Sequence, residues 1–471
     1  MSIKPRLSRG LRDLLPESMM ARQRLIDTVR GVYETYGFSP LETPAIEYLD
    51  VLSGSAGQEA QQSIFRVSNP EEERLGLRFD LTVPLSRVIR QYQGIPLPFR
   101  RYQVSPVWRA DKPDPGRFRQ FTQFDLDAVG APCGRADIEI LAAICDSLSA
   151  LGVGPYLVKF SSREILNLLL KRARIAEGLA TDVFRVLDKI DKIGLGKVKL
   201  ELTSGYVDRS GDPIRGVGLD ARQLGVIEEF LSIEGATRSE VLRQLGTLFQ
   251  GVEGSDEQLE VVGGISSSLD ALGYHSDRVA LDVSIARGLA YYTGPVFEAV
   301  LLDAPQFGSV FGGGRYDNLV SRFGGPKIPA TGASLGVDRL LAAVEKLGRA
   351  GGPKTAAQVL VTVMDEALSE ECMALGFELR RAGIRTEVHV GSGRLGKQLK
   401  RADKLGIPYA ILMGSNEVEQ GVVTVKQMAV AHKLGRGITS KDDWKAARFG
   451  QRPVARTEVA KTLRRLLADD R

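Results

Sequence analysis

The sequence has few of the residues that build disulfide frameworks and metal sites. Its 471 residues include only three cysteines and three histidines. The cysteines form no C-x-x-C pair, and their odd number argues against a disulfide scaffold and against a zinc site built from cysteine. The histidines are scattered along the chain, and a lone histidine is more often a structural or surface residue than a ligand. We therefore expect no metal site built from protein side chains.

Long apolar runs and the common nucleotide-binding loops are also missing. No run of residues is long enough to span a bilayer, and the basic first residues, MSIKPRLSRG, are not followed by an apolar stretch. This predicts a cytoplasmic protein that does not enter a membrane. No G-x-x-x-x-G-K-S/T loop occurs, and GVGLDA at 216–221 resembles a dinucleotide loop only weakly. A bound nucleotide would need another kind of site.

The composition itself is that of a globular protein. Hydrophobic residues make up 43% of the chain and charged residues 26%, which is enough apolar material for a buried core. At roughly 100–200 residues per domain, two or three domains are expected. The net charge of +5 fits a polyanionic partner. It also fits many proteins that bind no nucleic acid, so charge alone does not decide between them.

The chain before residue 348 mixes extended and helical patterns. Apolar residues at helical spacing predict a helix over 20–36, and the two prolines of 38–50 suit an extended edge segment. Residues 171–272 are helical and charge-rich, which indicates an insertion. The remaining patterns predict a largely antiparallel sheet whose strands are far apart in sequence, at 77–84, 98–109, 117–129, 278–286 and 295–303.

A second, smaller α/β domain is predicted after a linker. GRAGGPKTAAQ at 348–358 combines small residues, Gly-Gly and Pro. Strand and helix patterns then alternate, which is typical of a separate α/β domain. We expect strands at 359–364, 384–390 and 408–414, helices at 366–383 and 394–405, and a charged helical tail at 456–471.

Arginines suggest how a nucleotide could bind. Segment 99–127 (FRRYQVSPVWRADKPDPGRFRQFTQFDLD) has the pattern strand, loop, strand, with Arg109 ending the first strand and Arg117 and Arg119 beginning the second. On the second strand, Gln123, Asp125 and Asp127 share one face at period two. Arginine binds phosphate bidentately and keeps its charge, as a reaction at phosphorus requires. The alternative for this segment, taken alone, is a solvated hairpin of mixed charge.

Three later segments favour the first interpretation. ARGLAYYTGPVFE at 286–298 places Arg287 beside Tyr291 and Tyr292, and a buried arginine there would need an anionic partner. In GGGRYDNL at 312–319, three glycines indicate a close backbone approach or a tight turn. ATGASLGVDRLL at 330–341 has small residues that lead into an apolar helix. Such a strand, with Arg339 near the start of the helix, suits purine stacking and a phosphate tail.

Together these segments resemble the class II aminoacyl-tRNA synthetases, and among them the histidyl-tRNA synthetases. The resemblance covers nearly the whole chain. Pro44 stands at the position of the first class II motif, 99–127 resembles the second motif and 330–341 the third. RGLAYYTG and GGGRYDNL resemble two signatures peculiar to the histidine enzymes, and they are jointly improbable by chance. LRFDLTVPLSR at 77–87 resembles the pocket for the amino group, and 392–414 resembles the anticodon-binding domain.

The resemblance implies an α+β fold. Residues 1–347 would form the catalytic core on the class II antiparallel sheet, with a helical insertion at about 171–272. Residues 348–357 would be the linker, and 358–471 an α/β anticodon-binding domain with its helical tail. It also implies a homodimer that uses ATP with Mg²⁺, L-histidine and tRNA(His).

Residue roles follow by position. Arg109, Arg287 and Arg339 would be the catalytic cations. Arg109 and Arg287 would contact the α-phosphate and the histidine carboxylate, and Arg339 would stack on adenine. Asp111, in place of the usual glutamate, would contact adenine, and Arg117 would bind the outer phosphates. The histidine-binding set would be Asp80, Leu81, Thr82, Arg109, Gln123, Asp127, Arg287, Tyr291 and Tyr292.

A rival interpretation is the regulatory subunit of an ATP phosphoribosyltransferase, which resembles the same catalytic domain. That paralogue typically lacks the anticodon-binding domain and loses motif arginines, whereas this chain keeps both. Ala290, where the family usually has aspartate, is the one feature that leans toward the rival. A second rival is an RNA-binding or signalling protein on an inactive synthetase fold, and the intact arginine set argues against it.

Overall fold

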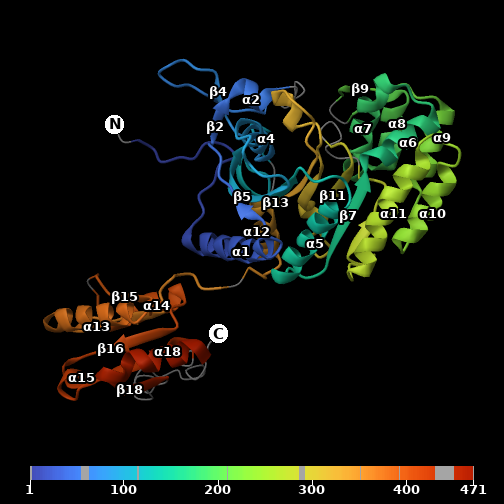
Figure 1. Ribbon diagram of the computed structural model, residues 1–471. Coiled ribbons are helices and arrows are strands. Elements are labelled where there is room, and N and C mark those ends of the chain that lie inside the picture. Colours follow the sequence, from blue (N-terminus) through green and yellow to red (C-terminus); the bar gives the residue numbers. More distant parts are fainter. Residues whose placement is uncertain are drawn as a thin grey trace. The chain divides into compact units, whose positions relative to one another are not determined.

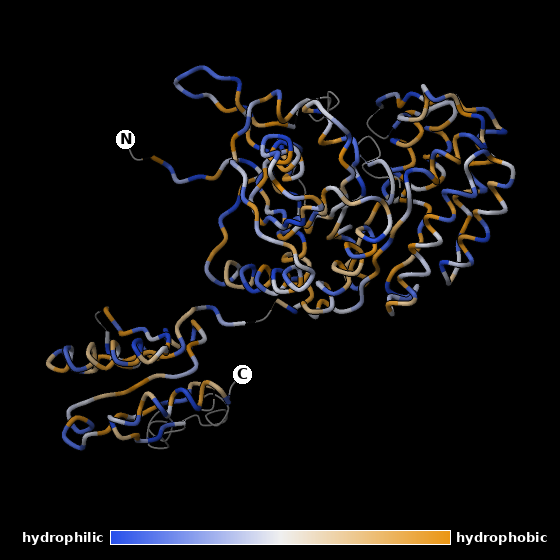
Figure 2. Tube along the Cα trace, in the orientation of Figure 1, coloured by the Kyte–Doolittle hydropathy of each residue, from blue (hydrophilic) through white to orange (hydrophobic). Residues whose placement is uncertain are grey.

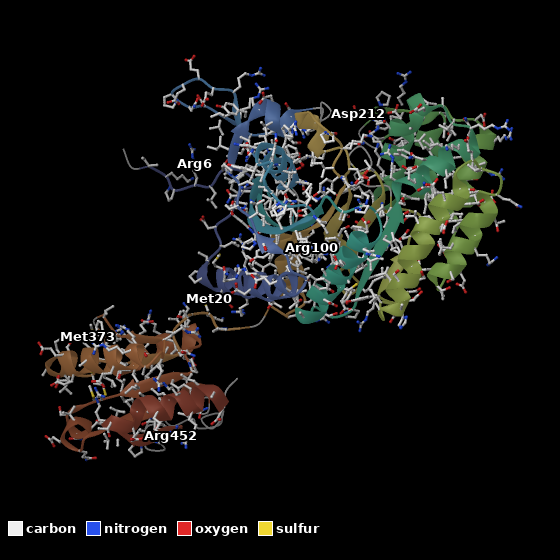
Figure 3. All side chains as sticks on the ribbon, in the orientation of Figure 1. Arg6, Met20, Arg100, Asp212, Met373 and Arg452 are labelled. Carbon is white, nitrogen blue, oxygen red and sulfur yellow. The ribbon has the colours of Figure 1, made fainter. Side chains whose placement is uncertain are left out.

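The computed structural model describes residues 3–54, 63–113, 116–208, 211–285, 292–350, 352–391, 393–429 and 450–469. The chain divides into two compact units (Figure 1). The first combines Met1–Asp13 with Arg22–Ala350, and the second combines Leu14–Ala21 with Gly351–Arg471. The described side chains are drawn in Figure 3. Within the part of the chain that the structure describes, no helix is both long and apolar enough to cross a membrane.

An eight-stranded sheet is the centre of the first unit. Two outer pairs, β1 with β5 and β10 with β7, are parallel, and the other neighbours are antiparallel. The predicted, largely antiparallel sheet is confirmed. Its order is β1 (Ser39–Pro40), β5 (Phe99–Trp108), β6 (Gln120–Val129), β13 (Ala330–Gly336), β12 (Ser309–Arg315), β11 (Pro295–Leu301), β7 (Tyr156–Ser162) and β10 (Val279–Leu281).

Helices cover one face of this sheet. Helix α5 (Arg135–Ala150) packs against β13, β12, β11 and β7, and α12 (Val337–Lys346) packs against β6, β12 and β13. Helix α1 (Pro16–Thr35) adds the buried ring of Tyr33, which lies 4.8 Å from that of Phe124 on β6. Apolar side chains at helical spacing form this covered side. The opposite face of the sheet carries polar side chains.

A small sheet and two helices border that polar face. The sheet has the order β2 (Ile46–Tyr48), β4 (Leu75–Leu77), β3 (Arg66–Val67), and the helices are α2 (Leu49–Ser53) and α4 (Thr82–Gln91). The strand predicted at 77–84 is therefore wrong beyond Leu77. The Asp80 carboxylate accepts a hydrogen bond from the backbone N–H of Val83 at 3.0 Å, as a residue at a helix N-terminus does. Burial of one face of α4 then favours the helix over a strand.

The residues between β7 and β10 form the helical insertion. In Figure 2 its helices alternate between hydrophobic and hydrophilic colours along their length, as amphipathic helices do. A hairpin, β8 (Gly205–Val207) and β9 (Pro213–Arg215), accompanies them. The helical elements are α6 (Arg163–Ala173), η1 (Glu177–Leu179), α7 (Ala180–Leu187), α8 (Ile190–Leu202), α9 (Ala221–Leu231), α10 (Arg238–Leu248) and α11 (Ser255–Ala271).

The second unit contains a five-stranded sheet. Its order is β15 (Thr386–Val388), β14 (Val359–Val361), β16 (Tyr409–Leu412), β17 (Val422–Gln427) and β18 (Gln451–Ala455). The predicted strand–helix alternation is confirmed up to β16, while β17 and β18 were not predicted. The helical elements are η4 (Glu366–Leu368), α13 (Ser369–Arg381), α14 (Leu395–Leu405), α15 (Ser415–Glu419), η5 (Arg456–Glu458) and α18 (Val459–Asp469). Strand β14 lies between β15 and β16 and is parallel to both.

Candidate active site

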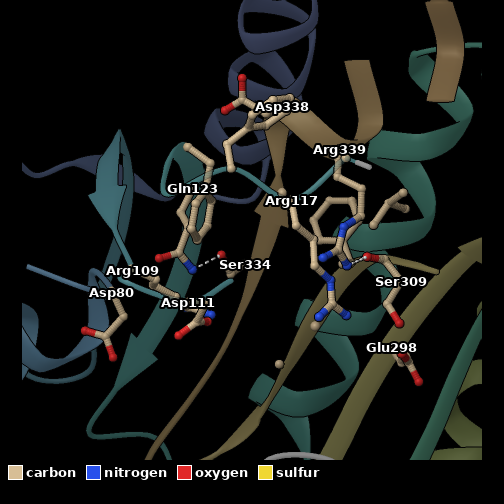
Figure 4. Close-up of a pocket in the computed structure, with 18 of the residues that line it drawn as sticks. Asp80, Arg109, Asp111, Arg117, Gln123, Glu298, Ser309, Ser334, Asp338 and Arg339 are labelled. Carbon is tan, nitrogen blue, oxygen red and sulfur yellow. Dashed lines mark hydrogen bonds between the residues drawn. The ribbon is translucent and has the colours of Figure 1, made fainter. Parts of the chain in front are cut away.

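A cavity of about 580 Å³ lies on the polar face of the eight-stranded sheet. This volume is in the range of small-molecule sites. Figure 4 shows carboxylates, an amide and arginines around it. Eight of the predicted site residues line it, namely Asp80, Thr82, Arg109, Asp111, Arg117, Gln123, Tyr292 and Arg339. The fold thus brings together side chains from the start of α4 and the segment before it, the β5–β6 hairpin, the segment before β11 and the start of α12.

Glycines on β12 and β13 keep part of the cavity open. A Cβ added to Gly312 would meet no atom within 4 Å, so this glycine borders open space. A Cβ on Gly313 would lie 2.3 Å from the carbonyl oxygen of Gly332 on β13. Gly313 therefore serves a close backbone approach, and the three glycines before Arg315 lie inside a strand and not in a tight turn.

Polar side chains at one end of the cavity are held by short hydrogen bonds. The Gln123 amide nitrogen donates to the Ser334 hydroxyl at 2.7 Å. Burial raises the pKa of the Asp80 carboxyl above its usual value, because the charged form is poorly solvated there. Thr82 lines the cavity, whereas Leu81 is fully buried and does not. Leu81 contributes its carbonyl oxygen, which accepts a hydrogen bond from Arg101 at 3.1 Å.

Beside this end lies a buried charged cluster formed by Arg101, Asp125 and Asp127. Nη2 of Arg101 is 2.8 Å from Asp127 Oδ2 and 3.9 Å from Asp125 Oδ2. The Tyr316 hydroxyl donates to Asp127 Oδ1. Burial raises the pKa of Asp127 and raises that of Asp125 to about 7, and the Arg101 guanidinium opposes both shifts. Asp127 is buried and does not itself line the cavity.

Three arginines approach the cavity from different elements. Nε of Arg109, at the end of β5, donates to the Phe79 carbonyl at 3.0 Å, and its guanidinium lies 5.2 Å from the centre of the Phe121 ring. Nη1 of Arg339, in the first turn of α12, donates to the Ser309 carbonyl at 2.6 Å. Figure 4 shows Arg117 and Arg339 on the same side of the cavity. Converging guanidinium groups are suited to bind a polyphosphate.

Two further predicted residues have defined positions. Asp111 lines the cavity and accepts a hydrogen bond from the Ser63 hydroxyl at 2.7 Å. Tyr292 also lines it, and burial together with the charges of Asp125 and Asp127 raises the pKa of its phenol. Arg287, Ala290 and Tyr291 lie outside the described residues.

The cavity also contains polar residues that the sequence did not single out as binding residues. These are Glu298 on β11, Ser309 on β12, Ser334 on β13 and Asp338 on α12. Ser334 is opposite Asp125 in the β13–β6 register, and Glu298 is opposite Gly312 in the β11–β12 register. Alternation along each strand could place these side chains on one face. The order of the strands, which brings the faces together, cannot be read from local periodicity.

Two family models match the chain. The model described as Histidyl-tRNA synthetase matches residues 10–340, and the one described as Anticodon binding domain matches residues 358–441. The first therefore covers the cavity and the whole eight-stranded sheet. The second begins just before β14 and covers most of the five-stranded sheet.

Known proteins resemble the chain over its full length. The histidine–tRNA ligase of Paracoccus denitrificans is 42% identical and covers 98% of each chain. That of Rhizobium rhizogenes is 39% identical and covers 99% of this chain and 96% of its own length. The crystal structure of histidyl-tRNA synthetase from Nostoc sp. PCC 7120 is 31% identical with a TM-score of 0.81, and covers 98% of this chain and all of the other. The chain therefore belongs to the histidyl-tRNA synthetase family, within the class II aminoacyl-tRNA synthetases.

Proposed function

We propose that this chain activates L-histidine with ATP in the cavity and then transfers it to the 3′ end of tRNA(His). One observation carries the proposal. Arg109, Arg117 and Arg339 line the same cavity as Asp80 and Gln123, so cations for a polyphosphate and acceptors for an ammonium group lie in one site. Magnesium enters as part of the ATP substrate, because the chemistry at the outer phosphates needs charge beyond that of the arginines.

The first step is attack by the histidine carboxylate on the α-phosphorus. A bond forms between a carboxylate oxygen and phosphorus, the bond to the bridging oxygen breaks, and pyrophosphate leaves. Arg109 stabilises the charge that develops at the α-phosphate, and Arg117 and Arg339 bind the outer phosphates and the adenine. Arg287 would assist at the α-phosphate. Catalysis is then mostly positioning and charge stabilisation.

The second step transfers the histidyl group. The 3′-hydroxyl of the tRNA attacks the carbonyl carbon of the adenylate, an ester bond forms and AMP leaves with the electrons of the broken bond. No covalent intermediate with the protein is needed. The 358–471 domain would bind the anticodon arm, in keeping with the family model that matches residues 358–441.

The histidine substrate is held by groups at the polar end of the cavity. Asp80, Thr82 and Gln123 bind the α-amino group in this proposal, with Leu81 acting through its backbone. Asp127, Tyr291 and Tyr292 recognise the imidazole, which offers one donor and one acceptor. A pocket that pairs both nitrogens rejects analogues without them by about 10⁴-fold, so no editing step is required.

The oligomeric state and the cellular location that we propose are those that the family resemblance implies. We propose a homodimer that meets through the segment after Pro44. Ile46 and Tyr48 on β2 support this, because these residues are 45% and 52% exposed on the small sheet. A cytoplasmic location completes the proposal.

The decisive experiment is histidine-dependent ATP–pyrophosphate exchange with Mg²⁺ and no tRNA. The purified full chain should catalyse exchange with histidine and not with other amino acids. The regulatory-subunit alternative predicts no exchange at all. A folded, dimeric sample that is inactive would therefore overturn the synthetase proposal.

A substitution tests the imidazole pocket. Asp127→Asn keeps the size of the side chain but removes the carboxylate that Arg101 and Tyr316 contact. We expect the KM for histidine in exchange to rise by about 10–100-fold, as the loss of a charged hydrogen bond would cause. The KM for ATP should stay nearly constant.

The matched control is Asp182→Asn, the same chemical change in an exposed pair with Arg185 on the helical insertion. It should leave both KM values unchanged. Near-normal histidine kinetics in folded Asp127→Asn would show that Asp127 is structural.

A further inference from the structure

The segment before α1 crosses the end of the β5–β6 loop. The Gly10 carbonyl accepts a hydrogen bond from the backbone N–H of Arg119 at 2.8 Å, and the Leu11 N–H donates to the Ser8 carbonyl at 3.1 Å. Gly10 has a φ of +83°, and a Cβ there would lie 2.9 Å from Cγ of Arg119. A glycine is therefore required for the segment to approach the loop this closely.

Two residues later, Arg12 connects the loop with the start of α12. Its guanidinium carbon lies 4.0 Å from the centre of the Phe118 ring. Its Nη2 atom lies 2.6 Å from Asp338 Oδ1. The other oxygen of Asp338 accepts a hydrogen bond from the backbone N–H of Thr122 on β6 at 2.6 Å. Phe118 and Asp338 both line the cavity, whereas Arg12 does not.

The negative charge of Asp338 makes its ion pair with Arg12 important for the binding of an anionic ligand. The Asp338 side chain is 8% exposed and precedes Arg339, so a carboxylate lies in the wall of a cavity that we assign to a triphosphate. A like charge near the phosphates weakens their binding, and a carboxylate that loses its cation in a poorly solvated site is costly. Arg12 supplies the opposite charge from behind the cavity wall.

We propose that Arg12 is a positioning residue for the binding of ATP. Its guanidinium neutralises Asp338 and packs on the Phe118 ring, and these two contacts hold the β5–β6 loop and the start of α12 in place. Arg117 and Arg339 are thereby kept in position to bind the phosphates and the adenine. This inference rests on the proposed function for the identity of the ligand. Arg12 acts through Asp338 and Phe118 and does not touch the substrate. Its removal should therefore affect ATP and leave histidine, which binds at the polar end of the cavity, nearly unaffected.

Arg12→Ala in the full chain tests this. In ATP–pyrophosphate exchange the KM for ATP should rise roughly tenfold, because small misplacements of binding groups can cost up to about 100-fold. The KM for histidine should stay within about twofold, and the variant should still fold, with a melting temperature lowered by the loss of the cation beside Asp338. Arg12→Lys keeps the charge but loses the planar group over Phe118, and should lie between the wild type and Arg12→Ala.

The matched control is Arg30→Ala. Arg30 also pairs with an aspartate at 2.6 Å and its side chain is 34% exposed against 26% for Arg12, but its partner Asp27 is on the same surface helix. Both KM values should be unchanged. A second substitution separates charge from structure: adding Asp338→Asn to Arg12→Ala should restore part of the ATP affinity, because the unpaired carboxylate is gone.

Several results would overturn the inference. They are an unchanged KM for ATP in folded Arg12→Ala, an equal rise of both KM values, or a double variant no better than Arg12→Ala. If Arg12→Ala does not fold, Arg12→Lys replaces it. Its KM for ATP must then rise more than its KM for histidine, and otherwise the inference is wrong. Direct binding of Mg-ATP is measured in parallel. An inactive wild type would overturn the proposed function, while the binding of Mg-ATP to wild type and Arg12→Ala would still test Arg12.

Discussion

The sheets of the two units differ in what they bury. The five-stranded sheet of the second unit places mostly apolar side chains on both faces, with Val359, Ile411 and Val425 packed in one cluster with α13 and α18. A second cluster, with Leu360 and Ala410, packs against α14. The eight-stranded sheet has an apolar face under α5 and α12, but its other face buries Arg101, Asp125, Asp127, Gln103 and Gln123.

This contrast indicates that the five-stranded sheet is a supporting sheet, which only forms a core, and that the eight-stranded sheet is a binding sheet, which also carries a ligand site. Taking charged groups out of water costs several kcal/mol per ion unless partners compensate. In the first unit, Arg101 and Tyr316 contact Asp127, but the cluster is compensated only in part, since Nε and Nη1 of Arg101 have no hydrogen-bond partner among the described residues. Polar groups held under such conditions beside a cavity are typical of sites that bind a polar ligand.

The largest expected effect concerns the cavity arginines. Arg109→Ala removes a guanidinium at the end of β5, and kcat for exchange should fall about 10²–10³-fold, as for the loss of one charge-stabilising donor. The control is Arg100→Ala on the same strand, where Arg100 pairs with Glu139 and is 36% exposed. Steady-state exchange kinetics measure both. A similar loss of kcat in the two variants would mean that the arginines of this strand act through stability. The eight-stranded sheet would then not differ from the five-stranded sheet by binding a ligand.

The next prediction concerns the supporting sheet. Leu375 on α13 is fully buried in the apolar cluster, so Leu375→Ala should reduce the free energy of unfolding of that unit by about 2–5 kcal/mol. Both KM values in exchange should stay unchanged. Phe377→Ala, on the same helix but 47% exposed, should have a much smaller effect on denaturant unfolding. A raised KM for ATP in Leu375→Ala would show that the second unit takes part in activation.

The smallest effect concerns the pH dependence of stability. Burial raises the pKa of Asp125 to about 7, against about 3.9 in an unfolded chain. Between these two pKa values the folded state binds more protons than the unfolded state. The free energy of unfolding therefore falls as the pH rises, and the stability that protonated Asp125 contributes at low pH is lost.

Asp125→Asn should remove this pH dependence of the free energy of unfolding. Between the folded and unfolded pKa values of Asp125, the wild type should lose stability relative to Asp125→Asn by at most about 1.4 kcal/mol per pH unit. Denaturant unfolding between pH 4 and pH 8 measures the difference, with Asp27→Asn as a control at an exposed site. A difference that does not change between pH 4 and pH 8 would mean that Arg101 dominates and holds Asp125 ionised in the folded state.

Local periodicity in the sequence was enough to predict much of the fold and part of the site. Alternation along β6 placed Gln123, Asp125 and Asp127 on one face, and the glycines before Arg315 indicated a close backbone approach or a tight turn, of which the structure has the first at Gly313. In the second unit, strand and helix patterns predicted the order of elements up to β16. These features depend on residues near one another in the chain, so the periods of strand and helix encode them directly. The roles assigned to individual site residues came from the family resemblance and stay predictions.

The tertiary structure alone decided which segments meet. The sequence 77–84 has the composition of a strand, yet Thr82–Gln91 forms a helix, because one face of it packs on the core. The contacts of Asp127 with Tyr316 and of Asp338 with Arg12 join residues 189 and 326 positions apart. Such contacts depend on where the chain returns after whole elements have packed. No local pattern carries that information, since loop closure brings distant segments together only when burial elsewhere compensates its entropy.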